Sequence, residues 1–484
     1  MSKSGIRLSR RQALGVAVGG AAGAAGLSVL GAHLLGTKSS IASQAGASGA
    51  WTSPLDQPRA LAAHLLRRAG FGYTASDLDQ AASMKYSDLV DSVVNQKPDQ
   101  MPVPAKLTAY ASTVQAWYTH MATTSAQFPE RMALFWHGHL TSDYRKAFNL
   151  PFVYQQNVLY RNQGTGDLRT LLTKTTYDPL MIRYLDLDQS SAKAPNENFS
   201  REVMELYTLG VGNYTEDDVR EGARVFSGLR ISIFDKNGNR VKPPKRGTGA
   251  NALAQYYAQI DQLAADGATW QGQLVAAQHD QGSKTFLGQT GNFSPDDGVD
   301  IILSQAACAP FIANAALTYF ATPSPSKDLV NSVAAQLRSS KYDIKTMMRS
   351  IFTSSDFTDP SNYRSLVRSP ADYMVATMRA LDGSSLVPQA IAAGQQMDQI
   401  IYDPPTVGGW PLNGAWLDSS SDLARVNFAA QAVSMLKSLP SPSDGFTTQL
   451  DGVVGPDLAA VYNASQSDED RWYAILSSPE FQLK

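Results

Sequence analysis

Residues 195–210 read PNENFSREVMELYTLG, and this one window holds three glutamates, an arginine and two asparagines. Proline is favoured in the first turn of a helix, so the pattern predicts a helix that begins near Pro195. At about 100° per residue, Phe199, Val203 and Leu206 fall on one apolar stripe. The window therefore predicts an amphipathic helix and favours a helical fold.

Two polar faces flank this stripe. Glu197 and Arg201 stand four residues apart on the far side, where they predict an exposed ion pair. Asn198, Glu202 and Glu205 share a third face, and Glu202 lies roughly 60° from the centre of the stripe. A carboxylate so close to a core is costly unless a metal ion, an arginine or a proton pairs with it. Glu202 is therefore either a functional group or half of a structural ion pair with a buried arginine.

Helical patterns also fill most of the chain on both sides of this window. The fold class expected is mainly α, a multi-helical globular domain with a small β-hairpin insertion. The hairpin is indicated by LRISIFDKNGNRV at 229–241, which alternates and turns at Asn237-Gly238. Residues 251–272 are polar and rich in Ala and Gln, and predict an inserted, partly exposed helical segment. Longer helices are expected at 105–124, 129–138, 145–174, 215–229, 297–320, 325–339, 343–352, 369–381 and 421–438.

The first 47 residues have the pattern of an export signal of the twin-arginine type. Residues 9–14 read SRRQAL, a weakly apolar Gly/Ala-rich stretch follows, and small residues surround Ala45-Gly46-Ala47. The alternative is a membrane anchor, but so few leucines would hold a bilayer weakly. We expect residues 1–47 to be the signal, 48–58 a linker and 59–484 one large helical domain. Within it, 229–290 form the hairpin and inserted segment, and 297–484 form the C-terminal helical half.

Composition and charge limit the kinds of binding partner that the sequence predicts. The formal net charge of −2 gives no reason to expect nucleic acid as a partner, and a membrane is expected only through an uncleaved signal. The single cysteine, Cys308, excludes an intrachain disulfide and a four-cysteine zinc site. The oligomeric state is left open. The predicted location is the periplasm, the cell envelope or the outside of the cell.

Two histidine clusters are candidates for a metal site. RMALFWHGHL predicts a helix that ends near Gly138, and a turn there would let His137 and His139 converge on one divalent ion. The alternative is one core histidine and one that caps helix carbonyls. In HDQGSKTFLG, His279 could supply a further ligand, with Asp280 and Lys284 close by in the sequence.

A third candidate is the loop that starts at YDPPTVGGWP, residues 402–411, and continues to Trp416. Its prolines, glycines and tryptophans exclude a regular element and predict an ordered loop. Aromatic faces at Tyr402, Trp410 and Trp416 would suit a sugar, an aromatic ligand or a partner protein. A rigid loop that lines the core is the alternative.

Taken in order, five segments resemble one family, the bacterial domain-of-unknown-function family numbered 1800. The resemblance covers roughly residues 55–484 and implies a largely helical, usually exported protein without an established reaction. Members often carry His where this chain has Tyr207, which counts against Tyr207 as a ligand. The matching segments are HLLRRAGFG at 64–72, MALFWHGHL at 132–140, NENFSREVMELYTLGVGNYTEDDVREGARVFSG at 196–228, HDQGSKTFLG at 279–288 and YDPPTVGGWP at 402–411.

Two functions follow as hypotheses. The first is an exported, metal-dependent hydrolase acting on a polysaccharide or another envelope or extracellular polymer, with a divalent ion of unknown identity. The metal ligands of this hydrolase would be His137, His139, His279 and Glu202. Its catalytic groups would be Glu202, Glu205, Arg201 and Lys284. Its substrate-binding residues would be Asn198, Asp280, Tyr402, Trp410 and Trp416. The second is a non-catalytic envelope protein that binds a glycan or a partner protein.

Overall fold

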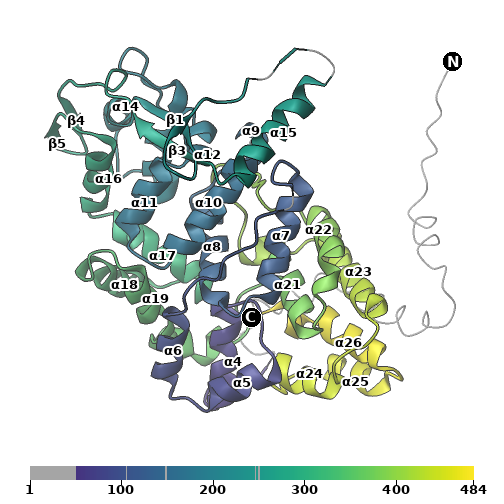
Figure 1. Ribbon diagram of the computed structural model, residues 1–484. Coiled ribbons are helices and arrows are strands. Elements are labelled where there is room, and N and C mark those ends of the chain that lie inside the picture. Colours follow the sequence, from purple (N-terminus) through teal and green to yellow (C-terminus); the bar gives the residue numbers. More distant parts are fainter. Residues whose placement is uncertain (1–50, 105, 148–149, 246, 249–250) are drawn as a thin grey trace, which may run out of the picture.

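The computed structural model describes residues 51–104, 106–147, 150–245, 247–248 and 251–484. The predicted export signal at 1–47 lies outside these residues, as does the start of the predicted linker. The described chain is mainly helical with two small antiparallel sheets, as the sequence predicts (Figure 1).

The helices and strands follow one another in three stretches. The first contains α4 (Pro58–Ala69), α5 (Ala75–Ala82), α6 (Tyr86–Val94), α7 (Tyr110–Thr123), α8 (Gln127–His139), α9 (Tyr144–Ala147), α10 (Leu150–Gln163), α11 (Leu168–Thr176), α12 (Pro179–Tyr184) and the short η1 (Leu187–Gln189). The second contains α13 (Asn198–Glu202), η2 (Val203–Thr208), α14 (Glu216–Val225), β1 (Leu229–Phe234), β2 (Arg240–Val241), α15 (Ala252–Ala265), β3 (Thr269–Leu274), β4 (Lys284–Phe286) and β5 (Gln289–Gly291). The third contains α16 (Pro295–Ser304), α17 (Cys308–Phe320), α18 (Lys327–Ser339), α19 (Ile344–Phe352), α20 (Ser355–Thr358), η3 (Pro360–Asn362), α21 (Pro370–Ala380), η4 (Ser384–Leu386), α22 (Val387–Gln396), η5 (Asn413–Trp416), α23 (Ser419–Met435), α24 (Pro442–Gln449), α25 (Pro456–Ala464), α26 (Asp468–Ser477) and α27 (Pro479–Gln482).

Two of the long predicted helices are interrupted. The stretch 145–174 is divided among α9, α10 and α11, and α10 stops before Gly164, where a Cβ atom would lie 2.3 Å from the Tyr160 carbonyl oxygen. The stretch 297–320 is divided into α16 and α17, whose axes differ by 78°. Helical periodicity continues across such breaks because both pieces bury one face against the same core.

The predicted hairpin is confirmed, but it belongs to a larger sheet. β1 pairs with β2 in the register Ile233 to Val241, and on its other edge it pairs along its full length with β3. β3 was not predicted: Thr269 is its only β-branched residue, and the expectation of a helical segment over 251–272 is wrong beyond Ala265, where α15 ends. Its Gly272 lets the strand approach the chain at Tyr177, whose carbonyl oxygen would lie 2.3 Å from an added Cβ.

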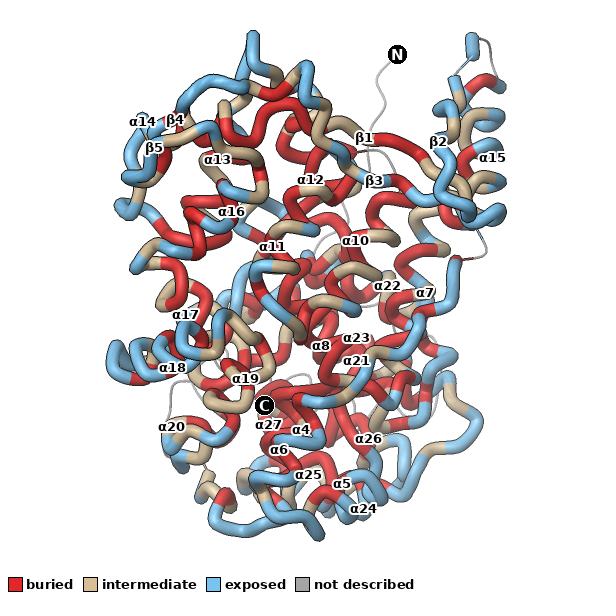
Figure 2. The backbone as a smooth tube through the Cα atoms, turned by 60° about the vertical axis from the view of Figure 1, so that its left-hand side comes forward, coloured by how far each residue is buried: buried red, intermediate tan, exposed pale blue. Residues whose placement is uncertain are grey.

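The core is centred on two helices that are buried on all sides. In α8 every residue from Phe128 to His137 is buried, and in α21 every residue from Pro370 to Met378. Figure 2 shows these helices inside the molecule, with exposed positions concentrated on outer helices such as α18, α24 and α25. One continuous apolar cluster contains residues from Ala62 to Phe481.

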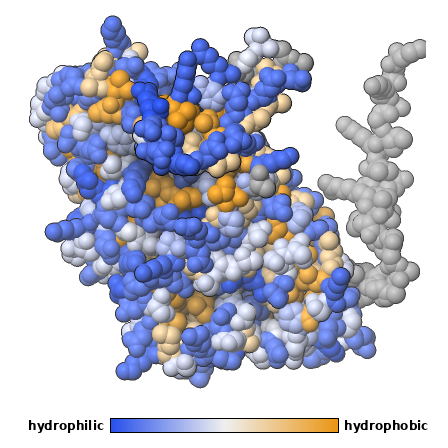
Figure 3. Space-filling model, viewed as in Figure 1, coloured by the Kyte–Doolittle hydropathy of each residue, from blue (hydrophilic) through white to orange (hydrophobic). Residues whose placement is uncertain are grey.

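The two ends of the described chain meet at one end of the molecule. Helices α4 to α6 lie there with α24 to α26, while both sheets lie at the opposite end with α14 and α16 (Figures 1 and 2). The surface seen in Figure 3 is mostly hydrophilic, with apolar patches near the middle of that face. In the described ranges no single helix is long and apolar enough to cross a membrane; the bent pair α16 and α17 passes the same test only when taken together.

Candidate ligand-binding site

Residues 195–210 do not form one regular helix. α13 is α-helical, but the chain continues from Val203 to Thr208 as a π-helix, in which the Thr208 hydroxyl and the amides of Leu209 and Gly210 bond to carbonyls five or six residues earlier. The wider turn buries Met204 and Tyr207 beside Val203. Wide turns of this kind are frequent at functional sites.

The predicted ion pair of this window is confirmed and extended. An Arg201 nitrogen lies 3.6 Å from a Glu197 carboxylate oxygen, and the guanidinium also donates two hydrogen bonds, of 2.8 and 2.7 Å, to Glu216. Asn198 donates to a carboxylate oxygen of Asp186 at 3.0 Å. Both side chains therefore have protein partners at the surface.

Glu202 and Glu205 differ in their surroundings. Glu205 accepts a hydrogen bond from the Tyr214 hydroxyl. Glu202 is half-buried and makes no hydrogen bond or ion pair with a described residue; burial, and then the charge of Glu205, raise the pKa of its carboxyl above the usual range. Neither glutamate is paired with a buried arginine in the described part of the chain. Of the two, Glu202 is the one whose carboxylate has no hydrogen-bond or ion-pair partner among the described residues.

His137 and His139 do not converge. The expected turn at Gly138 is wrong, because α8 continues through it to His139, which separates the two side chains by about 200° around the helix. His137 is buried among three aromatic rings, those of Trp117, Tyr402 and Trp410, at centroid distances of 5.0–5.6 Å. Burial lowers the pKa of His137 to about 3, so the imidazole is neutral.

His139 faces the other way. Its Nε2 lies 2.9 Å from the Tyr207 carbonyl oxygen, which can only accept, so Nε2 carries the proton. The ring stacks on Phe135 at 5.7 Å, and burial lowers its pKa to about 4. This bond joins α8 to the π-helix and leaves Nδ1 of a neutral imidazole as an acceptor.

The third cluster lies elsewhere in the fold. Nδ1 of His279 bonds to the Ser227 carbonyl at 3.0 Å, and Asp280 accepts from the Arg224 guanidinium at 2.7 Å. The Lys284 ammonium is buried and donates to the Asn292 side chain and the Phe293 carbonyl. These contacts hold β4 and β5 against α14. Among the described residues, no three His, Cys, Asp or Glu side chains form a group that could hold a metal ion.

The loop after Tyr402 is anchored in the core. Tyr402 is 1% exposed, adopts a positive φ of 68° and stacks on Trp117 at 4.9 Å. Gly409, with a φ of 86°, lies directly on α8: an added Cβ would be 2.0 Å from the Gly138 carbonyl oxygen. The loop is thus anchored at Tyr402 and at Gly409. Its Trp410 and Trp416 lie beside the end of α8.

These two tryptophans line a cavity of about 140 Å³. Its wall also includes the C-terminal turns of α8, two residues of α17 and the segment around η5. The indole N–H groups of Trp410 and Trp416 are buried and have no acceptor among the described residues. The lining residues are Leu134, Phe135, Gly138, His139, Ala315, Tyr319, Ser369, Gln399, Gly408, Trp410, Pro411, Leu412 and Trp416.

The pocket brings together three of the predicted site residues, His139, Trp410 and Trp416. It also contains Tyr319, Ser369 and Gln399, which the sequence did not single out. Tyr319 lies in α17, Ser369 is the N-cap of α21, and Gln399 lies in the irregular segment after α22, so none carries a motif of its own. Tertiary contacts place them here, such as those of Tyr319 with Phe135 and of Gln399 with the Ala371 amide.

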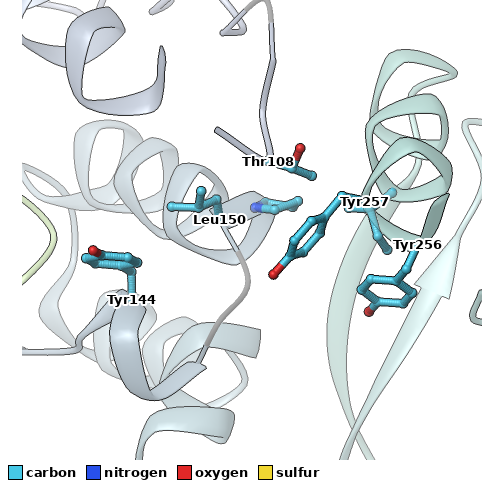
Figure 4. A pocket seen from close by; sticks show the side chains of 7 residues that line it. Thr108, Tyr144, Leu150, Tyr256 and Tyr257 are labelled. Atoms are coloured by element: carbon cyan, nitrogen blue, oxygen red, sulfur yellow. The ribbon is translucent and has the colours of Figure 1, made fainter. Parts of the chain in front are cut away.

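A second, smaller cavity of about 90 Å³ lies between α15 and the helical body (Figure 4). Tyr257 projects from α15 toward Leu150, and Tyr144 lies on the opposite side. The Asp261 carboxylate of α15 accepts hydrogen bonds from the backbone and hydroxyl of Thr108, at 2.9 and 2.6 Å. None of the predicted site residues lines this cavity.

The comparisons with known proteins agree with the resemblance seen in the sequence. Residues 64–483 match the family described as Protein of unknown function (DUF1800), and the chain belongs to that family. No curated protein and no solved structure matches the chain.

Proposed function

We propose that this chain is an exported protein that binds a saccharide in the pocket of Trp410 and Trp416. The carrying observation is that two indoles with unsatisfied N–H groups line one cavity, together with polar side chains from α8, α17, α21 and the segment after α22. Aromatic faces bind the C–H faces of sugar rings, and unpaired donors are costly until an acceptor reaches them. Sugar hydroxyls supply such acceptors.

Calorimetric titration of the purified protein with a panel of oligosaccharides tests this proposal. A binding oligosaccharide is expected to lose most of its affinity with Trp410→Ala, and part of it with Trp416→Phe, which keeps an aromatic face but removes the N–H. Tyr257→Ala, in the cavity under α15, is the matched control and should bind as the parent protein does. Equal affinity in the parent and both tryptophan variants would contradict the proposal.

A hydrolytic role is the second candidate, and Glu202 is the observation that favours it. A half-buried carboxylate with a raised pKa, next to a second carboxylate, suits general acid–base chemistry on a polymer. Only this hydrolytic function would use the divalent metal ion that the sequence predicts. Elemental analysis of the parent protein and of Glu202→Gln, with assays of polymer cleavage, tests it; cleavage that is unchanged in Glu202→Gln would count against it.

A further inference from the structure

We infer that the saccharide bound in the tryptophan pocket is acidic and places its negative group near Tyr319. The inference rests on the proposed binding function and specifies its ligand class. Two independent observations carry it: the hydrogen-bonding character of the lining, and the charge that lies behind it.

The polar groups of the lining are mostly donors. The Gln399 side-chain oxygen already accepts from the Ala371 amide at 2.7 Å, which leaves the NH₂ group, and the Ser369 oxygen accepts from the Asp372 amide, which leaves the hydroxyl proton. The indole N–H groups of Trp410 and Trp416 are donors only. Nδ1 of His139 is an acceptor. None of the described lining residues is an aspartate or glutamate, so an acceptor-rich group is the complementary ligand.

The wall behind Tyr319 carries an excess of buried positive charge. Arg131, Arg368 and Lys484 all lie within 3.5 Å of the Asp372 carboxylate, so three cationic side chains share one carboxylate side chain. All four side chains are at most 5% exposed. Nε and Nη1 of Arg131 have no hydrogen-bond partner among the described residues.

Tyr319 connects this cluster to the pocket. The Arg131 guanidinium lies 5.0 Å from the centre of its ring, and the Lys484 ammonium lies 5.5 Å from it. The same tyrosine lines the cavity. Charges that lack counterions in a protein interior act over such distances with little screening. A carboxylate or sulfate on a sugar ring would offset part of the excess and accept from the donors around it.

The test compares ligands that differ only in charge. Oligogalacturonate and its fully methyl-esterified form share one sugar chain, and a sulfated oligosaccharide of the same length separates the two kinds of acid. We expect at least one of the two acidic ligands to bind about tenfold more tightly than the ester. Lys484→Met, which removes one of the three cations, should reduce that preference while Tyr257→Ala leaves it unchanged.

The outcomes separate this inference from the proposed function. Equal binding of acid and ester by the parent protein overturns the acidic class and leaves saccharide binding intact. Binding of none of the ligands, acidic, esterified or neutral, overturns both. Because the acid and the ester are compared on the parent protein, the test stands even where Lys484→Met fails to fold.

Discussion

At the scale of single residues, the loop that carries Trp410 depends on one glycine. Gly409 has a positive φ and lies against the Gly138 carbonyl oxygen with no room for a side chain. The neighbouring Gly408 has no such constraint, because an added Cβ would find its nearest atom, the Thr406 hydroxyl oxygen, at 3.6 Å. The pair therefore offers a substitution and its matched control in adjacent positions.

Gly409→Ala is expected to lose about 1–3 kcal/mol of folding stability, because the left-handed backbone and the contact with α8 are both strained by a methyl group. It should also weaken ligand binding in the tryptophan pocket. Thermal unfolding and calorimetric titration measure the two effects. Gly408→Ala should leave the folding stability nearly unchanged, and an equal loss of stability in both variants would contradict the role of the Gly138 contact.

Asp178 makes the folding stability of the protein depend on pH. Burial raises its pKa to about 7, against hydrogen bonds from Met181, Gln156 and Leu180 that lower it. The pKa of Asp178 is higher in the folded protein than its value of about 3.9 in the unfolded chain. Protonated Asp178 therefore makes its full contribution to folding stability below about pH 4. It is lost as the pH rises through 7.

Asp178→Asn keeps a side chain that can accept from the Met181 amide, as Asp178 does at 3.0 Å. Its stability relative to the parent protein should therefore increase between pH 4 and pH 8. Urea unfolding at several pH values measures the difference, in which the titration of other groups cancels. A difference that is constant over this range would show that Asp178 is not the group responsible.

At the scale of elements, α15 is attached to the helical body by few buried residues. Only Ala252 and Ile260 of this helix are buried, and the Asp261 contact with Thr108 joins it to the helical body. The sequence predicted its helical, exposed character from the Ala/Gln-rich composition. It could not predict the cavity beneath, because Tyr144, Tyr256 and Tyr257 come together only when the insertion folds back on α9 and α10.

Asp261→Ala is expected to increase local opening of α15 without changing global stability. Amide hydrogen exchange should quicken by roughly 5- to 30-fold in α15, the range that the loss of hydrogen bonds worth about 1–2 kcal/mol allows. Asp266→Ala, at the exposed end of the same helix, is the control. Unchanged exchange in Asp261→Ala would mean that Ile260 packing alone holds the helix.

The elements of the candidate site were predictable to different degrees. The apolar stripe at Phe199 and Val203 and the exposed pair of Glu197 and Arg201 follow from helical periodicity, and the structure contains both. The π-helix does not follow from periodicity; it accompanies the burial of Tyr207, whose hydroxyl donates to the Thr141 carbonyl at 2.8 Å. The path of α8 through Gly138 has the same kind of origin, since tertiary packing overrides the weak local preference of one glycine.

At the scale of the whole molecule, buried arginines join distant segments. Arg68 donates to the carbonyl oxygens of Ala321 and Asn362, and Arg425 donates to that of Arg368. Arg67 makes a bidentate pair with Asp451, at 2.9 and 2.6 Å. Helical periodicity alone does not place both Arg67 and Arg68 inside, because arginine is usually exposed.

Arg67→Met is expected to cost about 3–5 kcal/mol, since it leaves the Asp451 carboxylate buried without its cation. The double variant Arg67→Met/Asp451→Asn should recover part of that loss. Arg59→Met, an exposed position on the same helix, should change stability by less than about 1 kcal/mol. Denaturant unfolding measures all three, and a double variant no more stable than Arg67→Met would contradict the coupling.

The pairing of Arg67 with Asp451 also has a consequence in time. The two residues are 384 positions apart, and ribosomes add about 5–20 residues per second, so α4 waits roughly 20–80 s for its partner to be synthesised. During that interval the Arg67 guanidinium lacks its carboxylate partner, although α4 can already pack on α5 and α6. The ion pair that joins α4 to Asp451 is therefore one of the last contacts to form as the chain emerges.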